Sequence, residues 1–185
     1  MPMFMEIDDE LDSDKVEIVL NELIARHDIL RTSFEIVAGE LMQRVHDNWK
    51  LDYKYLELSE DEAKIEKNNF IKPFDLGKAP LIRSELIKLR ENKYIFMIDM
   101  YHIICDGVSM GVLTDEFKKL YNGEKLNEVK AQYIDYTEWQ NGEDGQKVIK
   151  DEEKYCLDRL SGDLPTLNIK TDYERPKIKS YDGDR

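Results

Sequence analysis

The chain is poor in cysteine, in positive charge and in long apolar runs, and each shortage excludes a class of protein. Two cysteines, Cys105 and Cys156, are too few for a disulfide framework, and no cysteine–histidine cluster has the spacing of zinc ligands. No apolar run approaches the roughly 20 residues of a membrane-spanning helix. The acidic N-terminal residues lack a signal-peptide pattern. We therefore expect a cytoplasmic protein with no metal site.

Positive charge is scarce because 27 lysines and arginines face 40 aspartates and glutamates, and the formal net charge is −13. Proteins that bind nucleic acids or anionic membranes need a basic surface, so the sequence predicts neither partner. We interpret the acidic excess as a solvated surface. A length of 185 residues suffices for one domain with a sizeable core. No internal repeat or low-complexity linker divides the chain, so residues 1–185 are expected to form a single domain.

The N-terminal part of the chain alternates between strand and helix patterns. Residues 1–8 predict a strand with three apolar side chains on one face, and a one-sided helical stripe follows. The members of that stripe are Val16, Val19, Leu20, Leu23 and Ile24. A hairpin that turns at 38–40 and a strand over 51–55 come next. A capping-box pattern that begins at Ser59 predicts a helix extending to about Ile71.

Two strands and three helices are predicted in the rest of the chain. Strand 94–100 is almost wholly apolar and is expected to lie centrally, paired with strand 81–89. The helix after Gly107 has an apolar stripe composed of Val108, Val112, Leu113, Phe117, Leu120 and Tyr121. Tyr136 and Trp139 share one helix face and are expected in the core. Cys156, in a helix over residues 146–160, is expected to be a buried, inert thiol.

The most informative stretch joins the central strand to the helix after Gly107. It reads Asp-Met-Tyr-His-Ile-Ile-Cys-Asp-Gly-Val-Ser over residues 99–109 and carries His102 and Asp106 four residues apart. Histidine is the side chain best able to accept a proton near neutral pH. A helix N-terminus has free N–H groups and favours negative charge, and glycine lets a chain turn without a Cβ clash. His102, Asp106 and Gly107 thus meet at one turn before a helix, and the resemblance described next implies that they are the catalytic residues.

This stretch resembles the His-His-x-x-x-Asp-Gly motif of condensation domains in nonribosomal peptide synthetases, within the chloramphenicol-acetyltransferase-like superfamily. Tyr101 stands where the motif has its first histidine. Residues 26–34, Arg-His-Asp-Ile-Leu-Arg-Thr-Ser-Phe, resemble a second motif of the same family, Arg-His-x-x-Leu-Arg-Thr-x-Phe. Residues 73–76 with 79–81, residues 133–139 and the extended segment 164–176 resemble further parts of these domains in the family's order.

The resemblance implies an α/β fold (α+β, two-layer), namely one chloramphenicol-acetyltransferase-like half with helices packed on a mixed sheet. Condensation domains contain two such halves, and the catalytic turn faces a tunnel between them. This chain resembles the N-terminal half. It lacks the family's Ser-x-Ala-Gln-type opening motif and the Asp-Phe-Gly-Trp motif of the C-terminal half.

The implied reaction is formation of an amide bond between an acyl or peptidyl thioester donor and an aminoacyl thioester acceptor. Both substrates are held on 4′-phosphopantetheine of carrier proteins, which are the implied partners together with the C-terminal half. No cofactor is expected to bind this segment itself. His102 is expected to act as general base or to stabilise the tetrahedral intermediate. In the family, the arginine matching Arg31 pairs with the aspartate matching Asp106, and Tyr101 takes a supporting position.

Two other functions remain open. Because Tyr101 replaces a motif histidine, the chain could be a non-catalytic docking module of the same fold. A stand-alone acyltransferase acting on a small alcohol or amine is the other alternative, and self-association would then rebuild the two-half tunnel. Without the resemblance, His102 would be interpreted as a packed histidine and Arg31 as a surface arginine.

Overall fold

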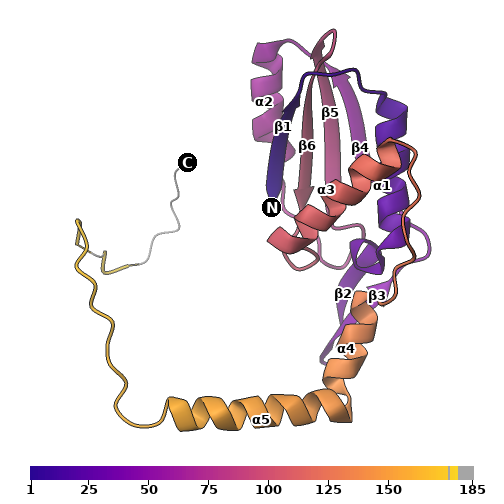
Figure 1. Cartoon of the computed structure of the whole chain (residues 1–185). Helices are drawn as coiled ribbons and strands as arrows, with labels where there is room; N and C mark the ends of the chain where they lie inside the picture. The colour runs from indigo at the N-terminus through magenta and orange to yellow at the C-terminus, as the bar shows by residue number, and fades with distance from the viewer. Residues whose placement is uncertain (175, 179–185) are drawn as a thin grey trace. The chain divides into compact units, whose positions relative to one another are not determined.

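The computed structural model describes residues 1–174 and 176–178. Residue 175, inside the family-like segment 164–176, lies outside the described residues. The chain divides into two compact units, Met1–Glu138 and Trp139–Arg185. The first unit contains the sheets and is drawn from indigo to orange in Figure 1. No helix in the described part of the chain is long and apolar enough to cross a membrane.

A mixed four-stranded sheet is the centre of the first unit. Its strands are β1 (Pro2–Ile7), β4 (Asp52–Glu57), β5 (Ile82–Arg90) and β6 (Lys93–Met100), in the order β1-β6-β5-β4. Strand β6 pairs antiparallel with both β1 and β5, whereas β4 runs parallel to β5. The prediction that the apolar strand lies inside the sheet is therefore confirmed.

Helices cover both faces of this sheet. The helices α1 (Ser13–Arg26) and α3 (Gly107–Tyr121) lie over one face (Figure 1) and share one apolar core with it. All members of the apolar stripe predicted for α1 are buried. On the other face, Ala63 and Phe70 of α2 (Glu60–Phe70) pack in a second core. The predicted α/β fold with a mixed sheet is confirmed. Because α2 covers the second face of the sheet, this unit has three layers, whereas the prediction had two.

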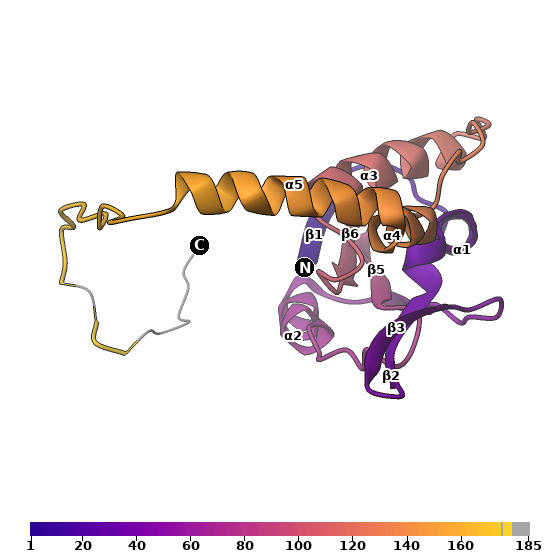
Figure 2. The same cartoon turned by 90° about the horizontal axis from the view of Figure 1, so that it is seen from below.

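A separate two-stranded ribbon follows α1. A short 3₁₀ helix, η1 (Asp28–Arg31), leads into β2 (Thr32–Val37), which pairs antiparallel with β3 (Glu40–Val45). The hairpin projects beyond one end of the four-stranded sheet (Figure 1), and Figure 2 shows the molecule from that end. Its turn lies at Ala38 and Gly39, both of which have positive φ. The predicted hairpin is therefore confirmed.

The prediction that the apolar stripe of α3 is buried was wrong in part. Val108 is 77% exposed and Val112 46% exposed, so neither lies in the core. The side chains that pack on the sheet are Met110, Leu113, Phe117 and Tyr121. Phe117 stacks on Phe96 of β6 with ring centroids 5.9 Å apart, so this side of the helix faces the sheet. The residues that face the sheet recur every three or four positions from Met110, and Val108 and Val112 are rotated away from that face.

Two further expectations of burial were wrong. Tyr136 in α4 (Tyr133–Asn141) is 48% exposed and Trp139 is 47% exposed. Cys156, in α5 (Glu143–Arg159) of the second unit, is exposed as well. An apolar pattern identifies the side chains suited to burial, but each becomes buried only where another element covers it.

Candidate functional site

The family-like turn begins where β6 ends and is anchored by its own backbone. The Tyr101 N–H donates to the Leu81 carbonyl at 3.0 Å, and the Ile104 N–H donates to the Tyr101 carbonyl at 3.1 Å. Ile104 and Cys105 are buried in the main core below the turn. Their burial raises the pKa of the Cys105 thiol, because a thiolate is poorly solvated there. The turn therefore has a fixed base and carries His102 on its outer side.

The His102 side chain is exposed. Across the described residues, its ring forms no hydrogen bond or ion pair with another side chain. A bound molecule can reach an exposed imidazole of this kind, which can act as an acid or a base. The geometry thus leaves His102 accessible for chemistry, in contrast to a packed histidine.

Asp106 is the N-cap of α3. Its Oδ1 accepts hydrogen bonds from the Ser109 N–H at 2.8 Å and from the Ser109 hydroxyl at 2.7 Å. The backbone bond from Ser109, followed by the hydroxyl bond, lowers the pKa of Asp106 below its ordinary value. The side chain is therefore a carboxylate near neutral pH and closes the turn against the helix.

The expected ion pair between Arg31 and Asp106 is not formed. The Arg31 guanidinium pairs with Asp28 within η1, donates to the His46 carbonyl at 2.7 Å and lies 3.6 Å from an Asp47 oxygen. Asp106 is exposed and occupied by its capping bonds. Both groups have nearer partners in their own loops, and those local bonds replace the long-range pair that the resemblance implied.

Gly107 occupies an open position. It is the first residue of α3, its φ is not in the left-handed region, and a Cβ added there would meet no atom within 4 Å. The chain itself therefore does not require glycine at this place. The expectation that the turn needs glycine to avoid a Cβ clash was wrong, because the backbone enters α3 in an ordinary helical conformation.

Tyr101 turns toward the family-like segment 73–76. Its ring is 39% exposed and meets the Phe74 ring edge-on, with centroids 6.2 Å apart and an interplanar angle of 89°. Edge-to-face contact is a favoured geometry for aromatic pairs. Two of the segments singled out in the sequence are thus in contact at the base of the turn.

The second motif connects α1 to α3. His27 is the C-cap of α1, and its Nε2 lies 2.6 Å from a carboxylate oxygen of Glu116 in α3. Arg26 donates to the same carboxylate at 3.1 Å. Burial opposes ionisation of Glu116, but the bonds from His27 and Arg26 outweigh it and lower the pKa of Glu116. The motif therefore holds together α1 and α3, the two helices that cover one face of the sheet.

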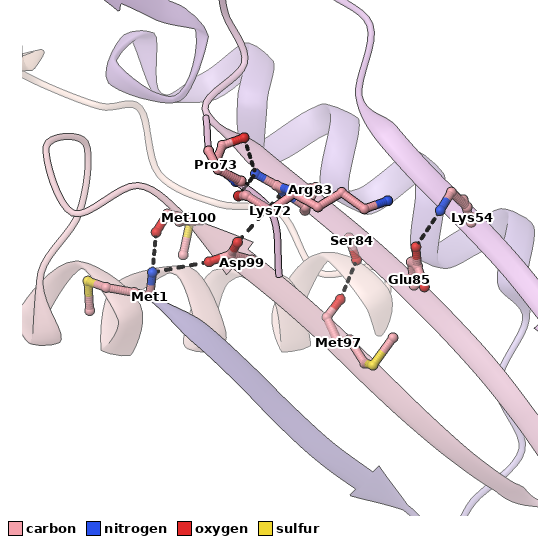
Figure 3. Close-up of polar contacts among 10 residues, drawn as sticks. All are labelled: Met1, Lys54, Lys72, Pro73, Arg83, Ser84, Glu85, Met97, Asp99 and Met100. Atoms are coloured by element: carbon pink, nitrogen blue, oxygen red, sulfur yellow. Dashed lines mark hydrogen bonds and ion pairs between the residues drawn. The ribbon is translucent and has the colours of Figure 1, made fainter. Parts of the chain in front are cut away.

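Sequence reasoning missed a buried charged pair close to the turn. Arg83 of β5 and Asp99 of β6 are 8% and 3% exposed and lie directly opposite in the sheet. Figure 3 shows Arg83 between Asp99 and the carbonyl groups of Lys72 and Pro73. The available signal was the single acidic residue in the otherwise apolar strand 94–100. No group of residues within the described chain has ligands suited to a metal ion.

Comparisons with known proteins agree on one family. The sequence model of one protein family, described as the condensation domain, matches residues 1–185. The chain is 45% identical over 185 residues to tyrocidine synthase 3 of Brevibacillus parabrevis, covering all of the chain and 3% of that protein. It is 40% identical over 185 residues to surfactin synthase subunit 1 of Bacillus subtilis (strain 168), covering all of the chain and 5% of that protein. The chain thus spans a small fraction of the length of these relatives.

Solved structures show the same fold. The X-domain in its complex with OxyB from teicoplanin biosynthesis superimposes with a TM-score of 0.79 at 25% identity, over 96% of this chain and 42% of that one. The condensation domain from the monacolin K polyketide synthase MokA superimposes with a TM-score of 0.78 at 17% identity, over 90% of this chain and 38% of that one. The chain therefore belongs to the condensation-domain family, and its resemblance to condensation domains of nonribosomal peptide synthetases is confirmed.

Proposed function

We propose that this chain supplies the catalytic turn of a condensation domain that forms an amide bond between two carrier-bound substrates. The observation that supports this function best is the exposed His102 on a turn anchored between β6 and α3. The donor is an acyl or peptidyl thioester and the acceptor an aminoacyl thioester, each held on 4′-phosphopantetheine. The partners are carrier proteins and the C-terminal half of a condensation domain.

The chemistry requires movement of a proton. The acceptor amine attacks the thioester carbonyl carbon, the tetrahedral intermediate carries an oxyanion, and the carbon–sulfur bond breaks as the carbonyl reforms. The amine nitrogen loses a proton and the departing thiolate gains one. His102 takes the amine proton or stabilises the intermediate. Because a thioester is already activated, positioning of the two substrates supplies much of the acceleration.

The other residues of the turn have supporting roles in this proposal. Asp106 keeps the turn closed as the N-cap of α3 and does not act as an acid, because its capping bonds favour the carboxylate. The open space above Gly107 leaves the backbone approachable from outside. Arg31 orders the neighbouring loop through Asp28, and Tyr101 supports the turn from the side of Phe74.

The experiment compares wild type with His102→Ala in the synthetase that contains this segment, with loaded carrier proteins and detection of the amide product by mass spectrometry. Ile103→Ala is the matched control, since Ile103 is an exposed neighbour in the same turn and has no acid–base chemistry. We expect loss of product in His102→Ala, with carrier binding retained, and normal product in Ile103→Ala. Equal product from wild type and His102→Ala would refute the proposal.

A docking module without catalysis is the second candidate. Tyr101 in place of the motif histidine favours it, and the X-domain with a similar fold was solved in a complex with OxyB. In that case the wild-type synthetase would form no amide at this module, while the segment would still bind a protein partner. Turnover by wild type therefore separates the two candidates.

A further inference from the structure

Two opposite charges lie inside the sheet next to the turn. Arg83 and Asp99 are paired positions of β5 and β6, and the Arg83 Nε lies 3.6 Å from the Asp99 Oδ2. The other Asp99 oxygen accepts from the amino group of Met1 at 3.1 Å (Figure 3). Buried charges are unfavourable unless they are paired, and apolar side chains of similar volume often stabilise a fold equally well. A buried pair at this position is thus weak evidence for stability alone.

Arg83 also holds the segment that runs beside the turn. Its Nη2 donates to the Lys72 carbonyl at 2.7 Å and to the Pro73 carbonyl at 3.4 Å. Its guanidinium carbon lies 3.7 Å from the centre of the Phe74 ring, within the range of a cation–π contact. A guanidinium is well suited to this task because it presents several donors in one plane and stacks on aromatic rings.

The contacts continue from Phe74 to the turn. The Phe74 ring meets Tyr101 edge-on, and Tyr101 directly precedes His102. Asp99 is also connected to the turn by the backbone, because it lies near the end of β6, three residues before His102. The pair is therefore linked to the turn by two routes, through the strand and through Phe74.

We propose that Arg83 and Asp99, acting through Phe74 and Tyr101, are positioning residues that fix where His102 is presented. They touch no substrate in this scheme. Their catalytic effect rests on the proposed function of His102, whereas their structural effect on the turn does not. Since Arg31 and Asp106 form no pair, the proposal assigns the ordering of the turn to Arg83 and Asp99.

The chain offers a matched control on the same strand. Glu85 is two residues from Arg83, so it points to the same face of β5, and it is similarly buried. Its carboxylate pairs with Lys54 of the edge strand β4 at 2.6 Å (Figure 3). Among the described residues, no aromatic contact links Glu85 to the turn. Glu85→Gln thus neutralises a buried sheet carboxylate and reports the effect of lost stability alone.

The first test is NMR of the histidine rings in this chain. The sequence contains only His27, His46 and His102, so each ring can be assigned by substitution. We expect Arg83→Met and Asp99→Asn to shift or broaden the His102 signals and to leave the other two rings unchanged. Glu85→Gln should leave all three unchanged. Unaltered His102 signals in the first two variants, or an equal change in Glu85→Gln, would overturn the proposal.

A further variant covers the case in which the charge variants do not fold. Phe74→Leu keeps an apolar side chain and the Arg83–Asp99 pair but removes the aromatic contacts with Arg83 and Tyr101. It is expected to move the His102 signals as well. A folded Phe74→Leu chain with wild-type His102 signals would overturn the aromatic route.

The second test measures amide formation by the full synthetase. For Arg83→Met we expect kcat to fall on the order of tenfold or more, since small displacements of a reacting group are costly. KM for the aminoacyl carrier should stay near the wild-type value, and Arg83→Lys should recover part of kcat because it keeps the charge. An active wild type with unchanged kcat in Arg83→Met would refute the positioning role. An inactive wild type would refute the proposed function, and the NMR result would still decide the positioning of the turn.

Discussion

At the scale of single residues, one carboxylate closes the turn. Asp106 caps α3 through Ser109, and its pKa is lowered by those bonds. A group whose pKa is lower in the folded than in the unfolded chain contributes stability above its ordinary pKa. That contribution disappears as the pH falls through the lowered value.

We predict that Asp106→Ala lowers the Tm at pH 7 and that its difference from wild type narrows as the pH falls toward 3. Asp106→Asn is the control, because asparagine is also a good N-cap but does not titrate. It should keep the Tm near wild type at pH 7. Thermal unfolding by circular dichroism at several pH values gives the result, and a difference that does not depend on pH would contradict the role of the carboxylate.

A second prediction concerns the partner of Arg31. A double-mutant cycle of Arg31→Ala and Asp28→Ala, measured by denaturant unfolding, is expected to give a coupling energy of about 0.5–3 kcal/mol, as for residues in contact. The same cycle with Asp106→Ala should be additive to within about 0.5 kcal/mol. Strong coupling between Arg31 and Asp106 would restore the pair implied by the family motif and contradict the bonds described above.

The sequence predicted the positions of the site residues but only some of their contacts. The motif identified where His102 and Asp106 lie in the chain, because local order along a turn is encoded by neighbouring residues. The motif did not predict the partners of Arg31, because contacts between loops depend on how the folded chain brings those loops together. The Arg83–Asp99 pair was missed because its importance comes from strand register, which no spacing within either strand discloses.

At the scale of elements, the contact between α1 and α3 is held by charge as well as by apolar packing. Glu116 of α3 accepts from Arg26 and lies against His27 at the end of α1. Hydrogen bonds to charged groups contribute more than neutral ones, and the carboxylate is only partly exposed.

We predict that Glu116→Gln lowers the free energy of unfolding by about 1–3 kcal/mol, because it weakens these charge-assisted bonds. Asp115→Asn is the matched control, since Asp115 is the exposed neighbour on the same helix. It should change the free energy of unfolding by no more than about 0.5 kcal/mol. Urea unfolding of both variants tests this, and equal losses would show that only net charge matters.

Strands, the hairpin and the capping box were predictable because their signals are local: alternation, turn residues and Ser59 bonded to Glu62. The side of α3 that faces the sheet could not be predicted, because Val108 and Val112 are as apolar as the residues that do face it. Which side of such a helix becomes buried is decided by tertiary contacts, here the stacking of Phe117 on Phe96.

At the scale of the whole molecule, the two units differ in how they are organised. Met1–Glu138 encloses both apolar cores, whereas residues 161–174 contain no helix or strand and are exposed throughout. Exposed segments without regular structure are preferred sites of proteolysis. Lys170 lies in this stretch.

We predict that a lysine-specific protease cleaves first after Lys170 or Lys177 and leaves the sheet intact. The product should keep the Tm of the full chain, since neither core loses a residue. Mass spectrometry of a time course identifies the cuts, and circular dichroism of the product measures its Tm. Early cleavage after Lys15 or Lys118, within the helices that cover the sheet, would contradict this organisation.

The three-residue span from Asp99 to His102 also limits which genetic changes the protein can accept. Side chains alternate between the faces of a strand, so one inserted or deleted residue near Met100 would separate the buried carboxylate from its arginine or direct the histidine elsewhere. A substitution such as tyrosine for histidine at position 101 leaves that spacing intact. Related chains are therefore expected to keep the length of this span, whereas the hairpin turn at Ala38 and Gly39 is free to grow or shrink.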